Sequence, residues 1–170
     1  MTGVPLALGA LALTEPVAAL VLTEPVAALA HRFVFHGFGM GWHRSHHQPP
    51  RRALEANDLF PVVFSALTIA VLSIGVWIGA GEVLIPIGIG VTAYGAGYLV
   101  VHDLVIHRRI AGLAIPDRVG HRLRDAHNVH HLFSDAPFGF LAPVVPRRLR
   151  AAAVARGRDE TPRAVSRRPA

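Results

Sequence analysis

Residues 59–102, LFPVVFSALTIAVLSIGVWIGAGEVLIPIGIGVTAYGAGYLVVH, decide the fold, because they contain two long apolar runs at 59–80 and 84–101. A Gly-Glu pair at 81–82 separates the runs and predicts a short turn. An α-helix needs about 20 residues to cross a hydrocarbon core of about 30 Å, so each run is long enough to span a bilayer. We therefore expect a hairpin of two membrane-spanning helices.

A third apolar run covers residues 4–30 and leads directly into the first histidines. No basic residue precedes it, so we interpret it as a retained span and not as a cleaved secretory signal. The whole chain is 52% hydrophobic, with a mean hydropathy of +0.41, which is too apolar for an ordinary soluble domain of this length. These features predict an all-α integral membrane protein with three to four transmembrane helices and a histidine-rich helical cap.

The octapeptide LTEPVAAL occurs twice in the first run, at 13–20 and 22–29. A shift of nine residues turns an α-helix by about 180°, so Glu15 and Glu24 should face opposite sides. Glu24 lies about two turns before His31 on a helix of about 3.6 residues per turn, and we expect it to reach a histidine or to line a path to the histidines. Glu15 lies deeper, where a carboxylate must be neutral, paired or turned toward protein.

All 17 basic residues are arginines, and the formal net charge is +6. None lies before Arg32 or between Arg52 and Arg108, so they flank the apolar runs. Cytoplasmic segments of membrane proteins are enriched in basic residues, which places both histidine-bearing segments on the cytoplasmic side of a multi-pass protein in the cell membrane. The sequence has neither a groove-reading motif nor a continuous basic face, which argues against a nucleic-acid partner.

The sequence after Pro146 differs in composition from the rest of the chain. Residues 147–170 hold many arginines, few aromatic residues and no apolar periodicity. Such a segment cannot bury enough apolar surface to fold alone, so we expect a disordered or membrane-surface tail. The predicted organisation is one membrane-embedded domain at 1–146, followed by this tail at 147–170.

Ten of the 11 histidines fall into four motifs, which form the pair HxxxxH and HxxHH twice in the same order. On an α-helix, the second and third histidines of HxxHH lie within about 60° of the first, so each such motif is predicted to aim its imidazoles at one point. The two members of HxxxxH lie about 140° apart, which suits an ion beside a helix end. His121 stands outside the motifs and is expected to be structural. The motif histidines are His31 and His36, then His43, His46 and His47, then His102 and His107, and finally His127, His130 and His131.

The histidine motifs predict a metal site. The chain has no cysteine, so a metal must be bound through nitrogen and oxygen. Ten imidazoles are too many for one ion, whereas two ions with about five each would keep a coordination position open, as iron enzymes do and structural zinc sites do not. Both metals accept imidazole, so spacing alone leaves iron and zinc open. Asp103 and Asp125 are expected to orient ligand histidines by hydrogen bonds to the second ring nitrogen.

These motifs and their flanking residues resemble the bacterial β-carotene hydroxylases of the fatty acid hydroxylase superfamily. The resemblance lies in EPVAALAHRFVFHGFGMGWHRSHH at 24–47 with EANDLF at 55–60, and in YLVVHDLVIHRR at 98–109 with AHNVHH at 126–131 and FGFL at 138–141. The duplicated octapeptide, the lack of lysine and the arginine-rich tail depart from familiar members.

The resemblance implies an O2-dependent, non-haem di-iron monooxygenase that hydroxylates carbon 3 of a β-ionone ring. Such an enzyme converts β-carotene to β-cryptoxanthin and zeaxanthin in carotenoid biosynthesis. The resemblance also implies that the ten motif histidines bind two iron ions, that no other residue is catalytic, and that reduced ferredoxin or an equivalent partner supplies electrons. The substrate is a stiff hydrocarbon of the bilayer, so Gly95 and Gly97, which leave room beside the run at 84–101, are the expected ring pocket.

Other functions fit the same motifs. A related membrane di-iron enzyme could act on another lipid, as a carotenoid ketolase, a sterol or fatty-acyl hydroxylase, or a desaturase, although desaturases usually show three histidine motifs over a longer chain. A membrane protein that binds or transports metal without redox chemistry is the alternative from another class. A transporter is expected to place its ligands near the bilayer midplane, whereas these histidines lie at the span ends.

Overall fold

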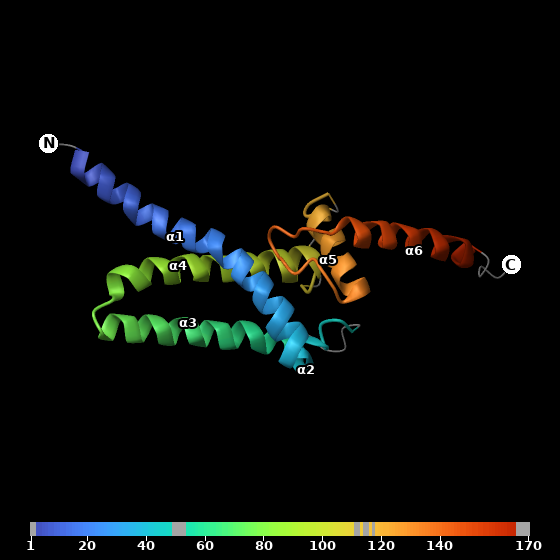
Figure 1. The fold of residues 1–170 in the computed structure, drawn as a ribbon, viewed down its shortest axis with the longest axis horizontal. Helices are drawn as coiled ribbons and strands as arrows, with labels where there is room; N and C mark the ends of the chain where they lie inside the picture. Colours follow the sequence, from blue (N-terminus) through green and yellow to red (C-terminus); the bar gives the residue numbers. More distant parts are fainter. Residues whose placement is uncertain (1–2, 49–53, 111–112, 114–115, 117, 166–170) are drawn as a thin grey trace.

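The computed structural model describes residues 3–48, 54–110, 113, 116 and 118–165, and Figure 1 shows their arrangement. These residues form helices and loops, without a β-strand, which confirms the all-α prediction. The elements in chain order are α1 (Gly3–Ala30), η1 (His31–Phe38), α2 (Met40–His43), η2 (Ala56–Asp58), α3 (Leu59–Trp77), α4 (Gly81–Tyr98), η3 (Leu99–Ile106), α5 (His121–Phe133) and α6 (Arg147–Val165).

Three helical stretches in the described part of the chain are long and apolar enough to cross a membrane. They are Thr14–Phe38, Ala56–Trp77 and Gly81–Ile106, which confirms the three predicted runs. Between 6% and 17% of the most apolar window of each stretch is buried within the protein. Most of their apolar side chains therefore face outward, as expected for helices that contact hydrocarbon.

Glycines let the three spans approach closely. A Cβ at Gly90 of α4 would overlap the Pro16 carbonyl and would lie 2.6 Å from the Ala19 Cβ of α1. A Cβ at Gly88 would lie 2.5 Å from Leu72 of α3. Small residues allow this close packing in membranes, where little hydrophobic force holds helices together.

The segments that carry the histidine motifs all lie at one end of the bundle. In Figure 1, α2 and α5 lie where α1, α3 and α4 converge, whereas the N-terminal end and the α3–α4 turn lie at the opposite end. A small aromatic core of Phe35, Phe60 and Phe140 lies at this histidine-rich end, where the Phe35 ring contacts His31 and His43. The Phe35 and Phe60 rings stack with their centroids 3.9 Å apart, which closes the bundle beneath the histidines.

The tail, for which the composition predicts a disordered or membrane-surface segment, contains helix α6 at Arg147–Val165. A location at the membrane surface stays a prediction. The first half of α6, RRLRAAAVAR, is rich in alanine, arginine and leucine, which are strong helix formers. Helix α6 contacts α5, and Leu149 is buried. The segment therefore combines high helix propensity with one buried leucine in its first turn.

Candidate metal centre

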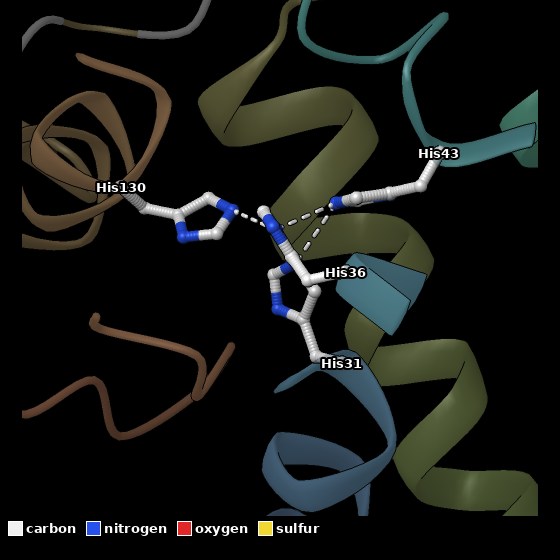
Figure 2. A group of neighbouring side chains, drawn as sticks. All are labelled: His31, His36, His43 and His130. Carbon is white, nitrogen blue, oxygen red and sulfur yellow. Dashed lines mark hydrogen bonds between the residues drawn. The ribbon is translucent and has the colours of Figure 1, made fainter. Parts of the chain in front are cut away.

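The ten motif histidines come together in two neighbouring groups. The ligand nitrogens of His31, His36, His43 and His130 all lie within 4.8 Å of one another, and Figure 2 shows these four rings converging. The same limit holds for His46, His102, His107 and His127. Six of these eight histidines are buried, and His36 and His107 are partly exposed.

His47 and His131 extend the two groups to five histidines each. The Nε2 atom of His47 lies 3.1 Å from that of His43. The Nε2 atom of His131 lies 2.8 Å from that of His127 and 3.1 Å from that of His46. We call the first set group A (His31, His36, His43, His47 and His130) and the second set group B (His46, His102, His107, His127 and His131). The rings of His47 and His131 stack with centroids 4.5 Å apart, so the two groups touch.

Each HxxHH motif is divided between the groups, so the prediction that it aims at one point is wrong. His43 and His47 belong to group A, whereas His46 between them belongs to group B. On a helical turn, positions i and i+4 lie about 40° apart and i+3 lies about 60° to the other side of i. The imidazole at i+3 therefore reaches a different centre. In α5 the same division sends His127 and His131 to group B and His130 to group A.

Each HxxxxH motif lies in or at the end of a π-helical segment, which the sequence pattern does not predict. His31 and His36 lie in η1, whereas His102 lies in η3 and His107 directly follows it. The backbone N–H of His107 donates to the carbonyl of His102 at 2.9 Å. A π-helix closes on the fifth residue, so two histidines five apart lie on one side. The wider turn thus removes the divergence of about 140° that an α-helix would impose on them.

Hydrogen bonds fix the tautomers of three histidines in group A. The Nδ1 atom of His31 donates to the Phe138 carbonyl at 2.9 Å, and that of His130 donates to the Asp135 carbonyl at 2.7 Å. The Nδ1 atom of His43 donates to the Oδ1 atom of Asn57 at 2.7 Å. Carbonyl and amide oxygens only accept, so the proton sits on Nδ1 and the Nε2 atom presents a bare lone pair.

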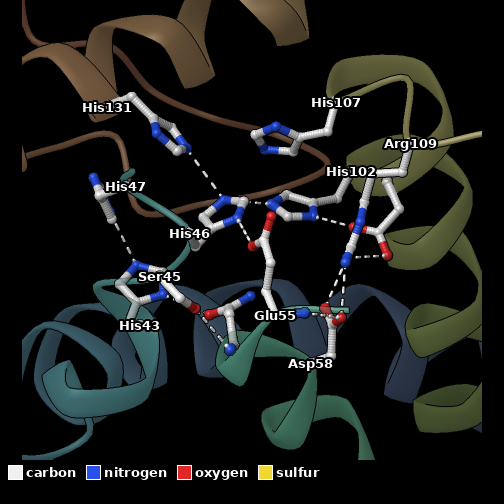
Figure 3. Close-up of polar contacts among 12 residues, drawn as sticks. His43, Ser45, His46, His47, Glu55, Asp58, His102, His107, Arg109 and His131 are labelled. Carbon is white, nitrogen blue, oxygen red and sulfur yellow. Dashed lines mark hydrogen bonds and ion pairs between the residues drawn. The ribbon is translucent and has the colours of Figure 1, made fainter. Parts of the chain in front are cut away.

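Carboxylates occupy the corresponding positions in group B, and Figure 3 shows one of them, Glu55, beside His46. The Nδ1 atom of His102 donates to the Oδ1 atom of Asp103 at 2.7 Å. The Nδ1 atom of His46 lies 3.5 Å from the Oε2 atom of Glu55, a buried oxygen without a hydrogen-bond partner among the described residues. Both contacts favour a proton on Nδ1 and a bare Nε2 atom.

An arginine links the two segments that carry these carboxylates. Arg109 donates to both carboxylate oxygens of Asp58 at 2.7 Å and lies 3.5 Å from Asp103. Asp58 in turn accepts the backbone N–H of Glu55 at 2.9 Å, which forms a capping box at the start of η2. The turn that carries Glu55 is therefore fastened to the segment that carries Asp103.

The donor set fits metal ions. Nine contacts between Nε2 atoms within the groups measure 2.8–3.3 Å. A metal–imidazole bond of about 2.1 Å places neighbouring ligand atoms at right angles about 3.0 Å apart. The facing Nε2 atoms of His31 and His43 both lack protons, so they cannot hydrogen-bond each other and instead offer lone pairs to a shared cation.

Burial keeps the imidazoles outside the spans neutral, which is the form that binds metal. Desolvation is the main cause in each case. It lowers the pKa of His43 and His47 to about 4 and the pKa of His107 and His130 to about 3. The pKa of His131 falls to about 2, because the neighbouring imidazoles add to the effect of burial.

Glu24 does not reach a histidine, which corrects that expectation. Its carboxylate accepts backbone N–H bonds from Phe140 at 2.9 Å, from Leu141 at 3.1 Å and from Ala142 at 2.9 Å. The Tyr94 hydroxyl donates to it at 2.6 Å. Glu24 thus fastens the loop that supplies the Phe138 carbonyl, and Phe140 of the same loop stacks on His31 with centroids 4.8 Å apart. Its effect on group A is therefore indirect.

The remaining predicted residues lie apart from the two groups. Asp125 is exposed on α5, two residues and therefore about 200° from His127, so the structure does not bring it to the histidines. A Cβ at Gly95 would meet nothing within 4 Å, and a Cβ at Gly97 would meet only Leu141 at 3.7 Å. His121 is exposed, and its Nδ1 atom lies 3.0 Å from the Arg118 carbonyl. Its structural role stays a prediction.

Sequence reasoning missed several residues that orient the histidines. Glu55 and Asn57 lie in EANDLF, just before an apolar run, where Glu55 and Asp58 form a capping box in the structure. The usual capping-box signature ends with Glu or Gln, so the Glu-x-x-Asp spacing does not signal a helix start. The carbonyls of Phe138 and Asp135 carry no sequence signal, because every residue has a carbonyl. Their roles depend on the loop conformation.

The fold and the histidine groups define a helical membrane protein with a buried, all-imidazole site able to bind metal ions. Comparison with known proteins gives the family. The chain is 45% identical to the β-carotene hydroxylase of Pantoea ananas over 122 residues, 66% of each chain. It is 39% identical to the β-carotene hydroxylase of Paracoccus sp. (strain PC1) over 142 residues, 78% of this chain and 86% of that protein. The chain belongs to the β-carotene hydroxylase family.

The chain is also similar to part of a longer relative. The chloroplastic β-carotene 3-hydroxylase of Haematococcus lacustris is 37% identical over 126 residues, 67% of this chain and 38% of that protein. No family model matches the chain. No solved structure matches it either.

Proposed function

We propose that the chain is a β-carotene 3-hydroxylase of carotenoid biosynthesis. It hydroxylates β-ionone rings, converting β-carotene to β-cryptoxanthin and then to zeaxanthin, with O2 as co-substrate. The names of its relatives support this substrate, and the Haematococcus relative supports position 3. The observation that carries the proposal is the pair of adjacent five-histidine groups, whose bare Nε2 atoms face one another.

The proposed cofactor is a pair of non-haem iron ions, one in each group. Five nitrogen ligands suit iron with an open position, and they exceed the four of a closed zinc site. Iron supplies the activation of O2 that inserts oxygen into an unactivated C–H bond. The ten histidines bind the ions as neutral imidazoles, and no other catalytic residue is proposed. We propose, on the basis of this chemistry, that the chain belongs to the fatty acid hydroxylase superfamily.

The protein supplies orientation and exclusion of water. Asp103 and the carbonyls of Phe138 and Asp135 hold the rings of His102, His31 and His130 in place. The stacked rings of Phe35 and Phe60 close the apolar side of the site. A site that is dry on one side keeps water from the reacting carbon.

The proposed location is the cell membrane, with the histidine groups at the cytoplasmic face. Arginines in both histidine-bearing segments support this orientation. A bilayer-dissolved carotenoid could then approach from the side, and we place its ring near Gly95 and Gly97, where α4 leaves space one to two turns before His102. Reduced ferredoxin or an equivalent partner supplies electrons from the water side. We place the catalytic domain at 1–146, with 147–170 outside it.

Pigment analysis in a bacterial host that accumulates β-carotene tests the function. The intact chain and a His121→Ala variant should produce 3-hydroxylated carotenoids, and His46→Ala should not. If β-carotene persists with folded, metal-loaded protein, the carotenoid substrate is wrong, and keto-carotenoids, sterols and fatty acyl chains are the next products to assay. Metal binding without any O2-dependent turnover would instead indicate a non-catalytic metal-binding protein.

A further inference from the structure

We propose that the two histidine groups are unequal and that group B binds its ion more tightly and fills first, because carboxylates act on its imidazoles. In group A, the Nδ1 atoms of His31, His43 and His130 donate hydrogen bonds to uncharged carbonyl and amide oxygens. The inference rests on the two-metal site proposed above, and it assigns Asp103 and Glu55 as positioning residues that set the order of metal binding.

The hydrogen-bond partners of group A carry no net charge. His31 and His130 donate to backbone carbonyls, and His43 donates to the amide of Asn57. The carboxylate of Asp135 is near enough for its charge to act on His36 of this group, although no histidine among the described residues donates a hydrogen bond to it. It pairs with Arg148 at 2.9 Å, and this pair is exposed, with 40% of the Asp135 side chain and 72% of the Arg148 side chain accessible.

The partners of group B are acidic and sheltered. Asp103 accepts from His102 at 2.7 Å with its side chain 21% exposed, and Glu55 lies 3.5 Å from His46 with its side chain 14% exposed. Asp58 joins them through Arg109. The network of these four side chains contains three carboxylates and one guanidinium. It therefore has a net negative charge beside group B.

The physical consequence is a difference in ligand strength. A carboxylate that accepts the Nδ1–H proton increases the electron density on the Nε2 atom, and such partners change metal affinity by about 10–100-fold. A nearby negative charge also attracts a cation, and it does so strongly where water is excluded. A neutral carbonyl or amide partner gives the ring orientation but not the charge. Both effects favour group B over group A.

The experiment titrates metal-free, full-length protein in lipid nanodiscs with Co²⁺, followed by visible absorption and equilibrium dialysis. Two classes of site are expected. His107→Ala should abolish the tight class and leave the weak one, whereas His36→Ala should abolish the weak class and leave the tight one. These two variants are matched, because each removes the second, partly exposed histidine of an HxxxxH motif.

Variants of the carboxylates then test whether these groups cause the tighter binding in group B. Asp103→Asn should weaken the tight class by about 10–100-fold and leave the weak class unchanged, and Asp103→Glu should restore part of the loss. Asn57→Asp should strengthen the weak class. The unaltered class in each variant shows that the protein is folded, so a selective shift cannot result from general misfolding.

Two equal classes in the wild type, loss of the tight class in His36→Ala, or an unchanged tight class in Asp103→Asn would overturn this inference while leaving the two-metal site intact. Absence of Co²⁺ binding by folded protein would overturn the two-metal site, and the inference with it.

Discussion

The Nε2 atom of His46 lies 3.1 Å from that of His102, although 56 residues separate them. His130 makes the reciprocal contact with His36 at 3.2 Å, across 94 residues. Each half of the chain therefore gives one histidine to the group that the other half builds. The two halves cannot form their groups independently.

This exchange predicts which variants act together. His46→Ala and His102→Ala remove ligands from the same group, so the double variant should retain about half of the wild-type metal, as each single variant does. His43→Ala combined with His102→Ala removes a ligand from each group and should leave almost none. Elemental analysis of purified protein measures this. Equal metal content in the two double variants would contradict the exchange.

The hydrogen bonds of Glu24 to the Phe140 loop predict that its loss lowers stability and weakens metal binding in group A. Glu24→Ala leaves the partly buried N–H groups of Phe140 and Leu141 and the exposed N–H group of Ala142 without their acceptor. Each partly buried group costs up to about 1–3 kcal/mol when unsatisfied, whereas the exposed group can bond to water. The melting temperature should fall, and group A should lose metal before group B. The duplicated octapeptide supplies the control, because Glu15→Ala changes the same sequence context at an exposed position.

Circular dichroism of both variants in detergent, combined with metal analysis, checks this prediction. Glu24→Gln keeps one acceptor oxygen and should give an intermediate result. Identical melting of Glu24→Ala and Glu15→Ala would show that the loop does not depend on Glu24.

The close approach of α1 and α4 at Gly90 predicts that a larger residue at this position destabilises the protein. Gly90→Ala would overlap the Pro16 carbonyl, and overpacking of this kind costs about 1–3 kcal/mol. Gly95→Ala on the same helix has open space and should be neutral or slightly stabilising, because alanine is the better helix former. Thermal unfolding of the two variants gives the comparison, and equal stability would exclude a close contact at Gly90.

The proposed ring pocket predicts a separation of turnover from metal binding. Gly95→Phe and Gly97→Phe should reduce hydroxylation several-fold and leave iron content near that of the wild type, because both glycines lie outside the histidine groups. Gly95→Ala is the small-residue control. Pigment analysis and iron analysis of the same preparations provide both readouts. Undiminished turnover in both phenylalanine variants would rule out this path for the ring.

The sequence predicted the spans and the ten histidines because both are local signals. Length and apolarity are sufficient to define α3 and α4, and motif spacing alone selects the ten histidines over His121. The grouping of those histidines is tertiary. His46 and His130 lie in motifs whose helical spacing suggests one centre, and only the packing of α5 against the other segments shows that each serves the opposite group.

Other parts depended on backbone conformations that side-chain patterns do not specify. The π-helical turn that aligns His102 with His107 follows from one backbone hydrogen bond at 2.9 Å. The carbonyl of Phe138 reaches His31 because Glu24 holds the adjoining loop, a contact across more than one hundred residues. Helix α6 contacts α5, and Leu149 in its first turn is buried, a tertiary contact that the composition of the tail does not reveal.

Iron content per chain tests the central claim most directly. We would purify the wild type, His121→Ala, and the double variant His36→Ala with His107→Ala, after loading with ferrous iron without oxygen. Two five-histidine groups predict about two ions per chain in the wild type and in His121→Ala, and almost none in the double variant. A single ion in the wild type, or iron retained by the folded double variant, would contradict the account.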